Sequence, residues 1–568
     1  MEITGSQIVI ECLIEQGVDT VFGYPGGAIL NIYDELYKNS NRIRHILTAH
    51  EQGASHAADG YARSTGKVGV CMATSGPGAT NLVTGIATAY MDSIPVVAIT
   101  CNVTNSQLGK DSFQEIDITG VTMPITKHNF IVHDVKDLAN TIRMAFEIAR
   151  SGRPGPVLID IPKDVTAAKV EYTAFDPATQ KPEGYQAEVL GVPTDEQIKH
   201  IADLINSSKK PFIYAGGGVI MSNASAELKE FAEKAQIPVA MSLMGKSAFP
   251  NKNPLSTGMI GMHGTYAANT ACDQSDLLLA IGCRFSDRVI GDPAKFAANS
   301  TIVQIDIDPA EINKMIEVDN ALVGDLKQIL TRLLPLINKK EPNEWTKQVE
   351  EWKKIVPAAY SKKPDAKSKE IAPKFIYEYV NSKVKPNAII TTEVGEHQMW
   401  TAQHYEFTEP RTFLTSGGLG TMGYGTGAAI GAQFANPGTQ VVHFAGDGSF
   451  RMNCNELATI QHYDLPIIIV IFNNHALGNV RLWQTLFYDK RYSHTTLDFG
   501  PDWPVLASAY GIKGYRAESE EEFKTAFDEA LKSGRPAIID AEINIDEMVL
   551  PMIPPGKPID FMMLDVRD

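Results

Sequence analysis

Two short polar motifs each follow a hydrophobic run in the C-terminal part of the chain. Gly446-Asp447-Gly448-Ser449 follows residues 441–445, and Asn473-Asn474 follows residues 466–472. Such runs predict buried parallel strands, whose carboxyl ends meet at the sheet edge where ligands bind. Glycines let the backbone approach phosphate oxygens, and hard oxygen atoms suit Mg²⁺. The sequence predicts a site for a metal-bound diphosphate, with the metal ligands Asp447, Asn474 and the Ala476 carbonyl and with Gly446, Gly448 and Ser449 against the phosphates.

The Gly-Asp-Gly motif is weak when it is taken alone, because it is usually an ordinary turn. Here the second motif, Asn473-Asn474, follows at the end of the next predicted strand. The pair resembles the motifs by which thiamine diphosphate enzymes hold their cofactor through a divalent metal. This resemblance makes the ordinary turn the weaker interpretation.

Glu51 is a candidate catalytic acid in the N-terminal part of the chain. It lies just before the small-residue run 57–63, which predicts a helix. On its own such a glutamate is more often a solvated helix cap. Thiamine enzymes, however, need one carboxylic acid to hydrogen-bond the aminopyrimidine ring, and a carboxyl group in an apolar cleft has the raised pKa that suits this proton relay. We therefore predict that Glu51 activates the cofactor and that the turn at Gly76, after the strand 68–73, lies near it.

The composition is that of an ordinary globular protein with an acidic balance. Hydrophobic residues form 44% and charged residues 21% of the 568 residues, and the net charge is −16. An acidic protein repels phosphate backbones, which argues against a nucleic-acid partner. No apolar run is long enough to span a bilayer, and the N-terminus lacks the features of a signal or transit peptide. Six cysteines without a CxxC pair favour buried thiols in a reducing compartment. We expect a cytoplasmic protein with no membrane partner.

Short hydrophobic runs alternate with longer amphipathic stretches along the whole chain, which predicts an α/β fold. Continuous Val, Ile and Leu runs indicate parallel strands covered on both faces by helices. The predicted strands are 68–73, 95–100, 156–161, 212–215, 277–281, 302–306, 441–445, 466–472 and 537–540. We therefore predict three doubly wound domains, each with a central parallel sheet.

Two stretches rich in Pro, Gly and polar residues, 176–195 and 339–374, are predicted linkers. They divide the chain into domains at 1–175, 190–340 and 370–545, with a C-terminal tail at 546–568. The similar segments 146–154 and 527–536 each precede a predicted strand. This internal echo predicts two like-folded domains on either side of a middle one.

Further distinctive motifs are spread along almost the whole chain. They include Tyr24-Pro25-Gly26-Gly27-Ala28, His50-Glu51-Gln52-Gly53, Ser75-Gly76-Pro77-Gly78, Phe113-Gln114-Glu115, Ile161-Pro162-Lys163-Asp164, Arg284-Phe285-Ser286-Asp287-Arg288, His397-Gln398-Met399-Trp400 and Leu550-Pro551-Met552-Ile553-Pro554. This set resembles the catalytic subunits of the acetohydroxyacid synthase (biosynthetic acetolactate synthase) family. The resemblance implies a pyrimidine-binding first domain, an FAD-binding middle domain, a third domain that binds the diphosphate and Mg²⁺, and a tail over the active site.

The resemblance also implies a thiamine diphosphate-dependent transferase of branched-chain amino-acid biosynthesis. Members of the family decarboxylate pyruvate and join the remaining two-carbon unit to a second 2-keto acid. Pyruvate as the acceptor gives 2-acetolactate, on the route to valine and leucine. 2-Ketobutyrate as the acceptor gives 2-aceto-2-hydroxybutyrate, on the route to isoleucine.

The residue roles that follow belong to the family and are carried onto matching positions. Glu51 activates the cofactor, Gly27 and Gln114 line the reaction centre, and Met422 wedges the cofactor into a bent shape. Lys163 and Phe113 shape the substrate entrance, Arg288 pairs with the acceptor carboxylate, and Trp483 forms the wall that favours 2-ketobutyrate. The other expected contacts to thiamine diphosphate are Pro25, Gly76, Asn81, Glu396, His397 and Gly420.

The middle segment contains a candidate flavin site. Gly216-Gly217-Gly218 follows a predicted strand, where a backbone can approach a pyrophosphate, although three glycines fit a plain turn equally well. The more specific motif is Arg284-Phe285-Ser286-Asp287-Arg288, which resembles FAD-containing biosynthetic members and is absent from catabolic ones. The implied flavin contacts are Arg153, Gly216, Gly217, Ser242, Leu243, Met262, His263, Gly282, Arg284, Asp306, Ile307 and Asp325. The flavin has no net redox role in the family reaction.

Three positions depart from the family pattern. Glu396 stands where the family usually has Gln beside the cofactor diphosphate, Ser286 replaces the commoner Asp, and Asn479 replaces the more usual Met. A carboxylate beside phosphate is repulsive unless it is protonated or turned away. We therefore expect Glu396 to weaken the binding of thiamine diphosphate.

Three other functions compete with the biosynthetic synthase. They are an FAD-free catabolic acetolactate synthase, a pyruvate oxidase-like flavoenzyme, and a catalytically silent subunit or binding protein. The intact residues Glu51, Asp447 and Asn474 argue against the last of these. Since the cofactor of the family lies between domains of two subunits, the resemblance implies a homodimer or homotetramer. Many members also bind a small regulatory subunit.

Overall fold

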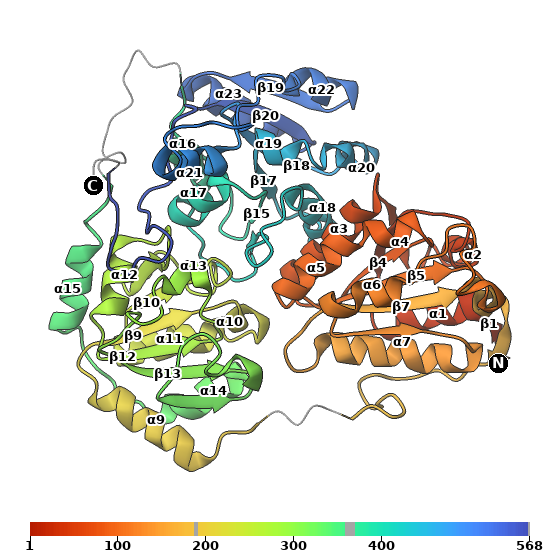
Figure 1. Ribbon diagram of the computed structural model, residues 1–568, viewed down its shortest axis with the longest axis horizontal. Coiled ribbons are helices and arrows are strands. Elements are labelled where there is room, and N and C mark those ends of the chain that lie inside the picture. The colour runs from red at the N-terminus through yellow and green to blue at the C-terminus, as the bar shows by residue number, and fades with distance from the viewer. Residues whose placement is uncertain (187–190, 358–369, 566–568) are drawn as a thin grey trace.

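The computed structural model describes residues 1–186, 191–357 and 370–565, which form three α/β units (Figure 1). Each unit contains a six-stranded sheet in which all neighbouring strands run parallel. Helices pack against each sheet. The predicted α/β class with three parallel sheets is therefore confirmed.

The N-terminal unit, red to orange in Figure 1, has the strand order β3-β2-β4-β5-β7-β6. Its strands are β2 (Thr20–Gly23), β3 (Arg44–Leu47), β4 (Gly69–Ala73), β5 (Val96–Asn102), β6 (His128–Ile131) and β7 (Val157–Pro162). Its helices are α1 (Gly5–Glu15), α2 (Leu30–Lys38), α3 (Glu51–Thr65), α4 (Pro77–Asn81), α5 (Val83–Met91), α6 (Ile118–Thr122), α7 (Val135–Arg150) and α8 (Lys163–Ala167). The short strands β1 (Glu2–Thr4) and β8 (Lys169–Glu171) pair antiparallel beside them.

The C-terminal unit repeats the strand connections of the N-terminal unit, in the order β16-β15-β17-β18-β20-β19. Its strands are β15 (Ile389–Thr392), β16 (Phe413–Leu414), β17 (Val441–Gly446), β18 (Ile467–Asn473), β19 (Lys513–Ala517) and β20 (Ala537–Glu542). Its helices are α16 (Pro373–Lys383), α17 (Glu396–His404), α18 (Gly425–Ala435), α19 (Asp447–Phe450), α20 (Leu457–His462), α21 (Gly478–Phe487), α22 (Trp503–Ala509) and α23 (Glu520–Ser533). The two echo segments lie at equivalent places, since α7 precedes β7 and α23 precedes β20. The prediction of two like-folded parts is confirmed.

The middle unit has a different order, β11-β10-β9-β12-β13-β14. Its strands are β9 (Pro211–Ala215), β10 (Val239–Met241), β11 (Ser256–Met259), β12 (Leu277–Ile281), β13 (Thr301–Asp306) and β14 (Asn320–Val323). Its helices are α9 (Asp195–Ser207), α10 (Gly218–Met221), α11 (Ser225–Ala235), α12 (Tyr266–Asp273), α13 (Asp287–Ile290), α14 (Leu326–Leu333) and α15 (Glu344–Trp352). The order reverses between β9 and β12, which is where doubly wound sheets open a crevice for ligands.

One expectation about local structure needs correction. Helix α15 lies inside the stretch 339–374 that we expected to be a linker, and its Trp345 and Val349 are buried against Phe212 in the middle unit. These apolar residues are spaced to face one side of a helix, so the lysines and glutamates around them are its solvent face.

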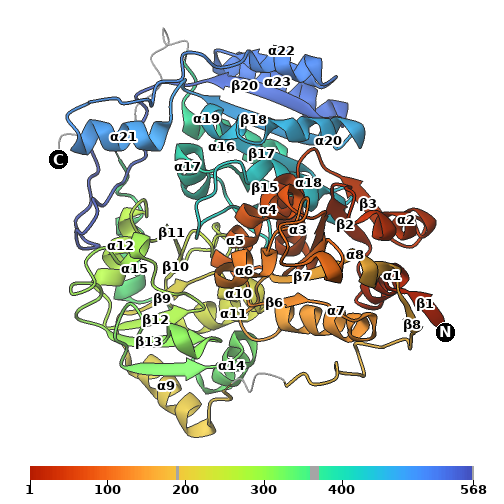
Figure 2. The same ribbon diagram turned by 45° about the vertical axis from the view of Figure 1, so that its right-hand side comes forward.

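Helices α3 and α18 pack directly on each other and join the N-terminal unit to the C-terminal unit, as Figures 1 and 2 show. A Cβ atom on Gly431 would lie 1.8 Å from the Ala57 carbonyl oxygen, and one on Gly60 would lie 2.2 Å from the Ala428 carbonyl oxygen. Glycine is therefore required at both crossings, because any side chain would push the helices apart. The apolar core continues across this contact from Phe22 to Ile469.

None of the helices in the described residues is long and apolar enough to cross a membrane.

Candidate functional site

The predicted metal ligands lie together at the carboxyl edge of the C-terminal sheet. Strands β17 and β18 are parallel neighbours, and Asp447 and Asn474 come directly after them. Both residues and Ala476 line one small cavity of about 60 Å³. Parallel strand ends therefore bring the three predicted ligands to one place, as the sequence predicts.

Asp447 is poised to receive a cation. It is 2% exposed, and its Oδ1 atom is buried without a hydrogen-bond partner within the described part of the chain. Burial raises its pKa to about 7. A buried carboxylate oxygen without a partner is costly, and a metal ion would remove that cost. The donor set therefore fits Mg²⁺, which commonly shares its ligands with a phosphate.

The backbone around Asp447 is closely packed. A Cβ atom on Gly446 would lie 2.9 Å from His397 Nδ1, and one on Gly448 would lie 2.6 Å from a methyl carbon of Leu477. His397 also lines the cavity, and burial lowers its pKa to about 3, so its ring is neutral. Ser449 and Met422 complete this wall. The cavity thus has glycine backbone and a neutral histidine where the sequence predicts a diphosphate.

Glu396 lies inside this cavity wall rather than in solvent. It is the first residue of α17, and its Oε2 atom accepts a hydrogen bond from Asn474 Nδ2 at 3.3 Å. Burial holds the pKa of its carboxyl group well above the ordinary value. A Cβ atom on Gly478 would lie 1.9 Å from the same oxygen, so the carboxyl group fills the space at the start of α21. The departure from the family pattern therefore touches a predicted metal ligand.

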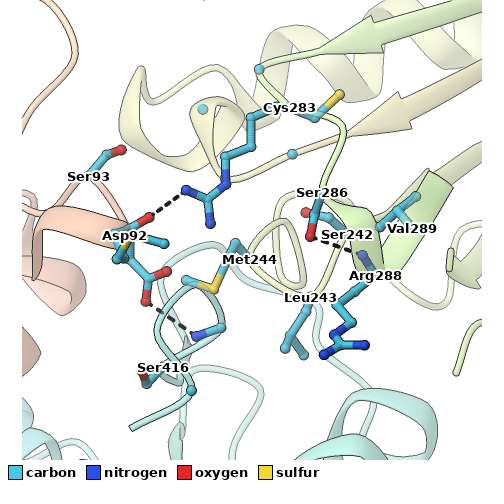
Figure 3. A pocket seen from close by; sticks show the side chains of 18 of the residues that line it. Asp92, Ser93, Ser242, Leu243, Met244, Cys283, Ser286, Arg288, Val289 and Ser416 are labelled. Atoms are coloured by element: carbon cyan, nitrogen blue, oxygen red, sulfur yellow. Dashed lines mark hydrogen bonds between the residues drawn. The ribbon is translucent and has the colours of Figure 1, made fainter. Parts of the chain in front are cut away.

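A much larger cavity of about 1320 Å³ opens on the middle unit (Figure 3). Every residue that the resemblance assigned to the flavin lines it: Arg153, Gly216, Gly217, Ser242, Leu243, Met262, His263, Gly282, Arg284, Asp306, Ile307 and Asp325. Gly420 from the C-terminal unit lines it too. The structure therefore brings the predicted flavin contacts together, although they come from distant parts of the chain.

The large cavity begins at the switch point between β9 and β12. Gly216 follows β9 and Gly282 follows β12, and a Cβ atom on Gly216 would lie 2.1 Å from the Gly282 carbonyl oxygen. This close approach leaves bare backbone facing the cavity, as pyrophosphate binding requires. Burial raises the pKa of Asp306, the last residue of β13, to about 6. The size of the cavity and its glycine edge fit a dinucleotide cofactor such as FAD.

Arg288 from the middle unit and Trp483 from the C-terminal unit also line the large cavity. The Arg288 guanidinium lies over the Trp483 indole at 5.8 Å, a cation–π distance. Ser286, one of the departures, caps α13 and accepts a hydrogen bond from Arg288 N at 3.3 Å (Figure 3). Asn479, another departure, lines both cavities.

A third group of predicted residues lines neither cavity. Its members are Pro25, Gly27, Glu51, Gly76, Asn81, Phe113, Gln114 and Lys163, all in the N-terminal unit. Glu51 is nearly buried at the first position of α3, and its Oε2 atom accepts a hydrogen bond from Asn81 Nδ2 at 2.9 Å. A Cβ atom on Gly76 would lie 2.9 Å from the Gln114 carbonyl oxygen, so these residues are neighbours. Phe113 is 87% exposed.

Comparison with known proteins places the chain in a class and then in a family. Its residues match the N-terminal thiamine pyrophosphate (thiamine diphosphate) binding domain at 3–121, the central domain at 198–333 and the C-terminal binding domain at 393–541 of thiamine pyrophosphate enzymes. The chain is thus a thiamine diphosphate-dependent enzyme with binding domains for that cofactor.

Curated relatives match over nearly their full lengths. The probable acetolactate synthase large subunit of Methanocaldococcus jannaschii is 49% identical, over 99% of this chain and 95% of the relative. The acetolactate synthase large subunit of Buchnera aphidicola is 45% identical over 100% of both chains. The acetolactate synthase of Arthrospira platensis is 45% identical over 99% of this chain and 98% of the relative. The chain therefore belongs to the acetolactate synthase large-subunit family, which confirms the resemblance of its motifs.

Sequence reasoning missed residues that act through the backbone. Asp92, Arg63 and Thr88 hold the segment that carries Gly420 and Met422. None of them belongs to a motif with a recognisable ligand. Their partners lie more than 300 positions away along the chain, and no local pattern reveals such a contact.

Proposed function

We propose that the chain is the catalytic subunit of an acetohydroxyacid synthase. It decarboxylates pyruvate and condenses the remaining two-carbon unit with pyruvate or 2-ketobutyrate, giving 2-acetolactate or 2-aceto-2-hydroxybutyrate. The observation that carries the proposal is the convergence of Asp447, Asn474 and Ala476 on one cavity in a chain that matches acetolactate synthases over its whole length.

Three cofactors belong to this proposal: thiamine diphosphate, Mg²⁺ and FAD. Asp447, Asn474 and the Ala476 carbonyl would hold the metal, and the backbone of Gly446 and Gly448 would face the diphosphate. Thiamine diphosphate, when bound, supplies the electron sink that makes decarboxylation of a 2-keto acid feasible. The large cavity of the middle unit has the size and the glycine edge that FAD needs.

The working site needs two copies of the chain. Glu51, the proposed proton relay, lines neither cavity of its own chain. The expected contacts around it include the exposed side chain of Phe113, which a partner subunit would cover. We therefore infer a homodimer or homotetramer in which Glu51, Gly27 and Gln114 face the diphosphate cavity of the partner.

The remaining roles concern the substrates. Arg288 would pair with the acceptor carboxylate, a task that suits a planar guanidinium, and Trp483 beside it would contact the extra methyl group of 2-ketobutyrate. Lys163 is exposed at the start of α8, where it could meet an entering acid together with Phe113. Met422 lines the diphosphate cavity, where it would bend the cofactor.

Two further parts of the proposal concern the setting of the enzyme. The Methanocaldococcus and Buchnera relatives are named large subunits, which supports a small regulatory partner for this chain as well. All six cysteines are free thiols, as a reducing cytoplasm would keep them.

The test is an assay of the purified protein with pyruvate, thiamine diphosphate, Mg²⁺ and FAD. We expect a yellow protein that forms acetolactate without consuming oxygen. A colourless active protein would indicate a catabolic synthase. Oxygen uptake or stoichiometric reduction of an acceptor would indicate a pyruvate oxidase-like enzyme. Absence of acetolactate would overturn the proposed function.

A further inference from the structure

One loop forms part of the wall of both cavities. Residues 415–423 join β16 to Tyr424, the residue before α18. Ser416, Gly417 and Gly420 line the large cavity, whereas Met422 lines the small one. The position of this 415–423 loop therefore affects the shape of both sites at once.

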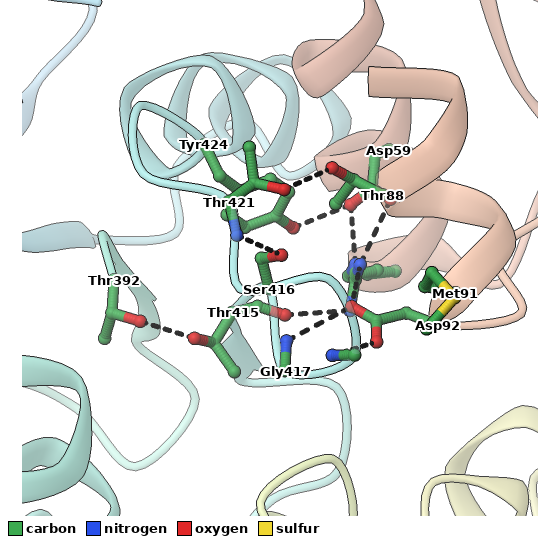
Figure 4. A network of polar contacts seen from close by, with 12 residues as sticks. Asp59, Thr88, Met91, Asp92, Thr392, Thr415, Ser416, Gly417, Thr421 and Tyr424 are labelled. Atoms are coloured by element: carbon green, nitrogen blue, oxygen red, sulfur yellow. Dashed lines mark hydrogen bonds and ion pairs between the residues drawn. The ribbon is translucent and has the colours of Figure 1, made fainter. Parts of the chain in front are cut away.

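Asp92 holds the backbone of the 415–423 loop from the N-terminal unit. It directly follows α5, and its carboxylate accepts hydrogen bonds from Gly418 N at 2.7 Å and Gly417 N at 3.3 Å (Figure 4). The Asp92 side chain is completely buried, so losing its bond to the half-buried Gly418 would leave a buried polar group unsatisfied. Thr88, within α5, places its hydroxyl oxygen 2.7 Å from that of Thr421. The end of α5 thus contacts both the beginning and the end of the loop.

Arg63 fixes the carboxylate of Asp92. Its Nη2 atom lies 2.9 Å from Asp92 Oδ2, its Nε lies 2.5 Å from Asp59 Oδ1, and its Nη1 donates to the Thr415 carbonyl oxygen at 3.0 Å. Two buried carboxylates therefore share one guanidinium. The Tyr424 hydroxyl group donates a hydrogen bond to Asp59 Oδ1 at 2.6 Å, which helps to stabilise the second carboxylate. Buried charges are tolerated only when they are paired in good geometry, so this arrangement has little freedom.

The loop backbone is enclosed between Asp92 and the predicted flavin arginine. Arg284 Nη1 donates to the Met91 carbonyl oxygen at 2.9 Å, next to Asp92. A Cβ atom on Gly418 would lie 2.6 Å from Asp92 Oδ1 and 2.8 Å from Arg284 Nη2. Any displacement of the loop would therefore disturb Arg284, which lines the large cavity.

We propose that Asp92 is a positioning residue that, through the 415–423 loop, sets the affinity for both thiamine diphosphate and FAD. The inference rests on the cofactors of the proposed function. Asp92 lines the large cavity only. An effect of Asp92 on thiamine diphosphate must therefore pass through the loop and Met422, not through direct contact.

The test compares two matched variants, Asp92→Asn and Asp59→Asn. Each removes one negative charge from the same guanidinium at an equally buried position, but only Asp92 bonds to loop amides. We expect Asp92→Asn to raise the dissociation constants of both FAD and Mg²⁺–thiamine diphosphate by about 10- to 100-fold, the usual effect of losing hydrogen bonds to a charged group. Asp59→Asn should keep both dissociation constants at wild-type values. It should lower the melting temperature about as much as Asp92→Asn does.

Flavin fluorescence and calorimetric titration with thiamine diphosphate measure the two constants separately from turnover. Equal weakening in both variants would mean a merely structural role and would overturn the inference. Weakening of FAD alone would reduce Asp92 to a flavin contact and would overturn it too. Should Asp92→Asn fail to fold, Thr88→Val removes only the hydroxyl next to Thr421, and we expect a smaller loss for both cofactors; no loss for either would overturn the inference. A wild-type protein that binds neither cofactor would instead refute the proposed function.

Discussion

The two cavities differ in which parts of the chain line them. The large cavity collects all of its predicted flavin residues within one chain, from the middle unit and from Arg153 in the N-terminal unit. The small cavity is lined only by the C-terminal unit, and Glu51 is absent from it. If the proposed function holds, flavin binding should depend on the fold of one chain, whereas catalysis should depend on the assembly of two chains. Substitutions can test this contrast.

The largest expected effect is that of Glu51→Gln. The glutamine side chain has the size of the glutamate and can still accept the hydrogen bond from Asn81, but it cannot relay a proton. We expect kcat for acetolactate formation to fall by about 100- to 10,000-fold, the range typical of losing a general acid–base group. Titrations should still show binding of both cofactors, because the predicted metal and diphosphate contacts of the small cavity and the lining of the large cavity are unchanged. A kcat near that of the wild type would exclude Glu51 from the proton relay.

A mixing experiment tests the assembly directly. Glu51→Gln and Asp447→Asn chains are each expected to be inactive, but a hybrid dimer would combine one intact Glu51 with one intact Asp447. After subunit exchange, an equal mixture should recover about a quarter of the wild-type activity, since half of the dimers are hybrids with one complete site. Continued inactivity of a mixture whose exchange is verified would show that each site is built within one chain.

Asp447→Asn should weaken the binding of one cofactor and leave the binding of the other unchanged. It removes the buried, negatively charged oxygen that has no partner in the described residues. We expect the dissociation constant of Mg²⁺–thiamine diphosphate to rise by at least about 10- to 100-fold, since even outer-shell partners of a metal cost that much. The dissociation constant of FAD, measured by fluorescence, should stay unchanged. A matching loss of flavin would mean that the cavities are not independent at this position.

The sequence alone predicted most of what one chain segment decides by itself. Runs such as 277–281 became strands because continuous Val, Ile and Leu residues suit the interior of a parallel sheet. Asp447 and Asn474 were predicted to meet because both follow neighbouring parallel strands. Helix α15 was missed because it has only two buried apolar residues, Trp345 and Val349, in a stretch rich in lysine and glutamate.

Contacts between distant segments could not be predicted in the same way. The bond from Gly418 to Asp92 joins a backbone amide to a carboxylate across two units, and a backbone amide carries no sequence signal. The position of Glu51 outside both cavities was expected only from the resemblance, which places the cofactor between two subunits, and in the structure it depends on how α3 packs against α18. The residues that carry chemistry were therefore easier to predict than the residues that hold them in place.

Trp483→Leu probes the proposed role of Trp483 as a substrate wall in the large cavity. A smaller side chain gives up contact with the extra methyl group of 2-ketobutyrate, and one such group is worth about tenfold or more in specificity. We expect the preference for 2-ketobutyrate over pyruvate to fall by about tenfold in competition assays. Phe487→Leu is the matched control, since Phe487 packs on Trp483 in the same helix but does not line either cavity. An unchanged preference in Trp483→Leu would remove the indole from the acceptor site.

Glu396→Gln is the smallest expected effect and the only one in the opposite direction. Glutamine has the same size and can still accept the hydrogen bond from Asn474, while its amide group can donate to a phosphate oxygen. Because the Glu396 carboxyl group must either stay protonated or repel the phosphate, whereas glutamine is always neutral, thiamine diphosphate should bind more tightly, by about three- to tenfold, which is up to about 1.4 kcal/mol. Glu406→Gln, at an exposed ion pair with Lys252 outside both cavities, is the control and should leave the titration unchanged. Equal or weaker binding in Glu396→Gln would contradict the expectation that this carboxyl group weakens the binding of thiamine diphosphate. The carboxyl group would then contribute to the small cavity, which would differ from the large one in accepting an acidic side chain beside a phosphate.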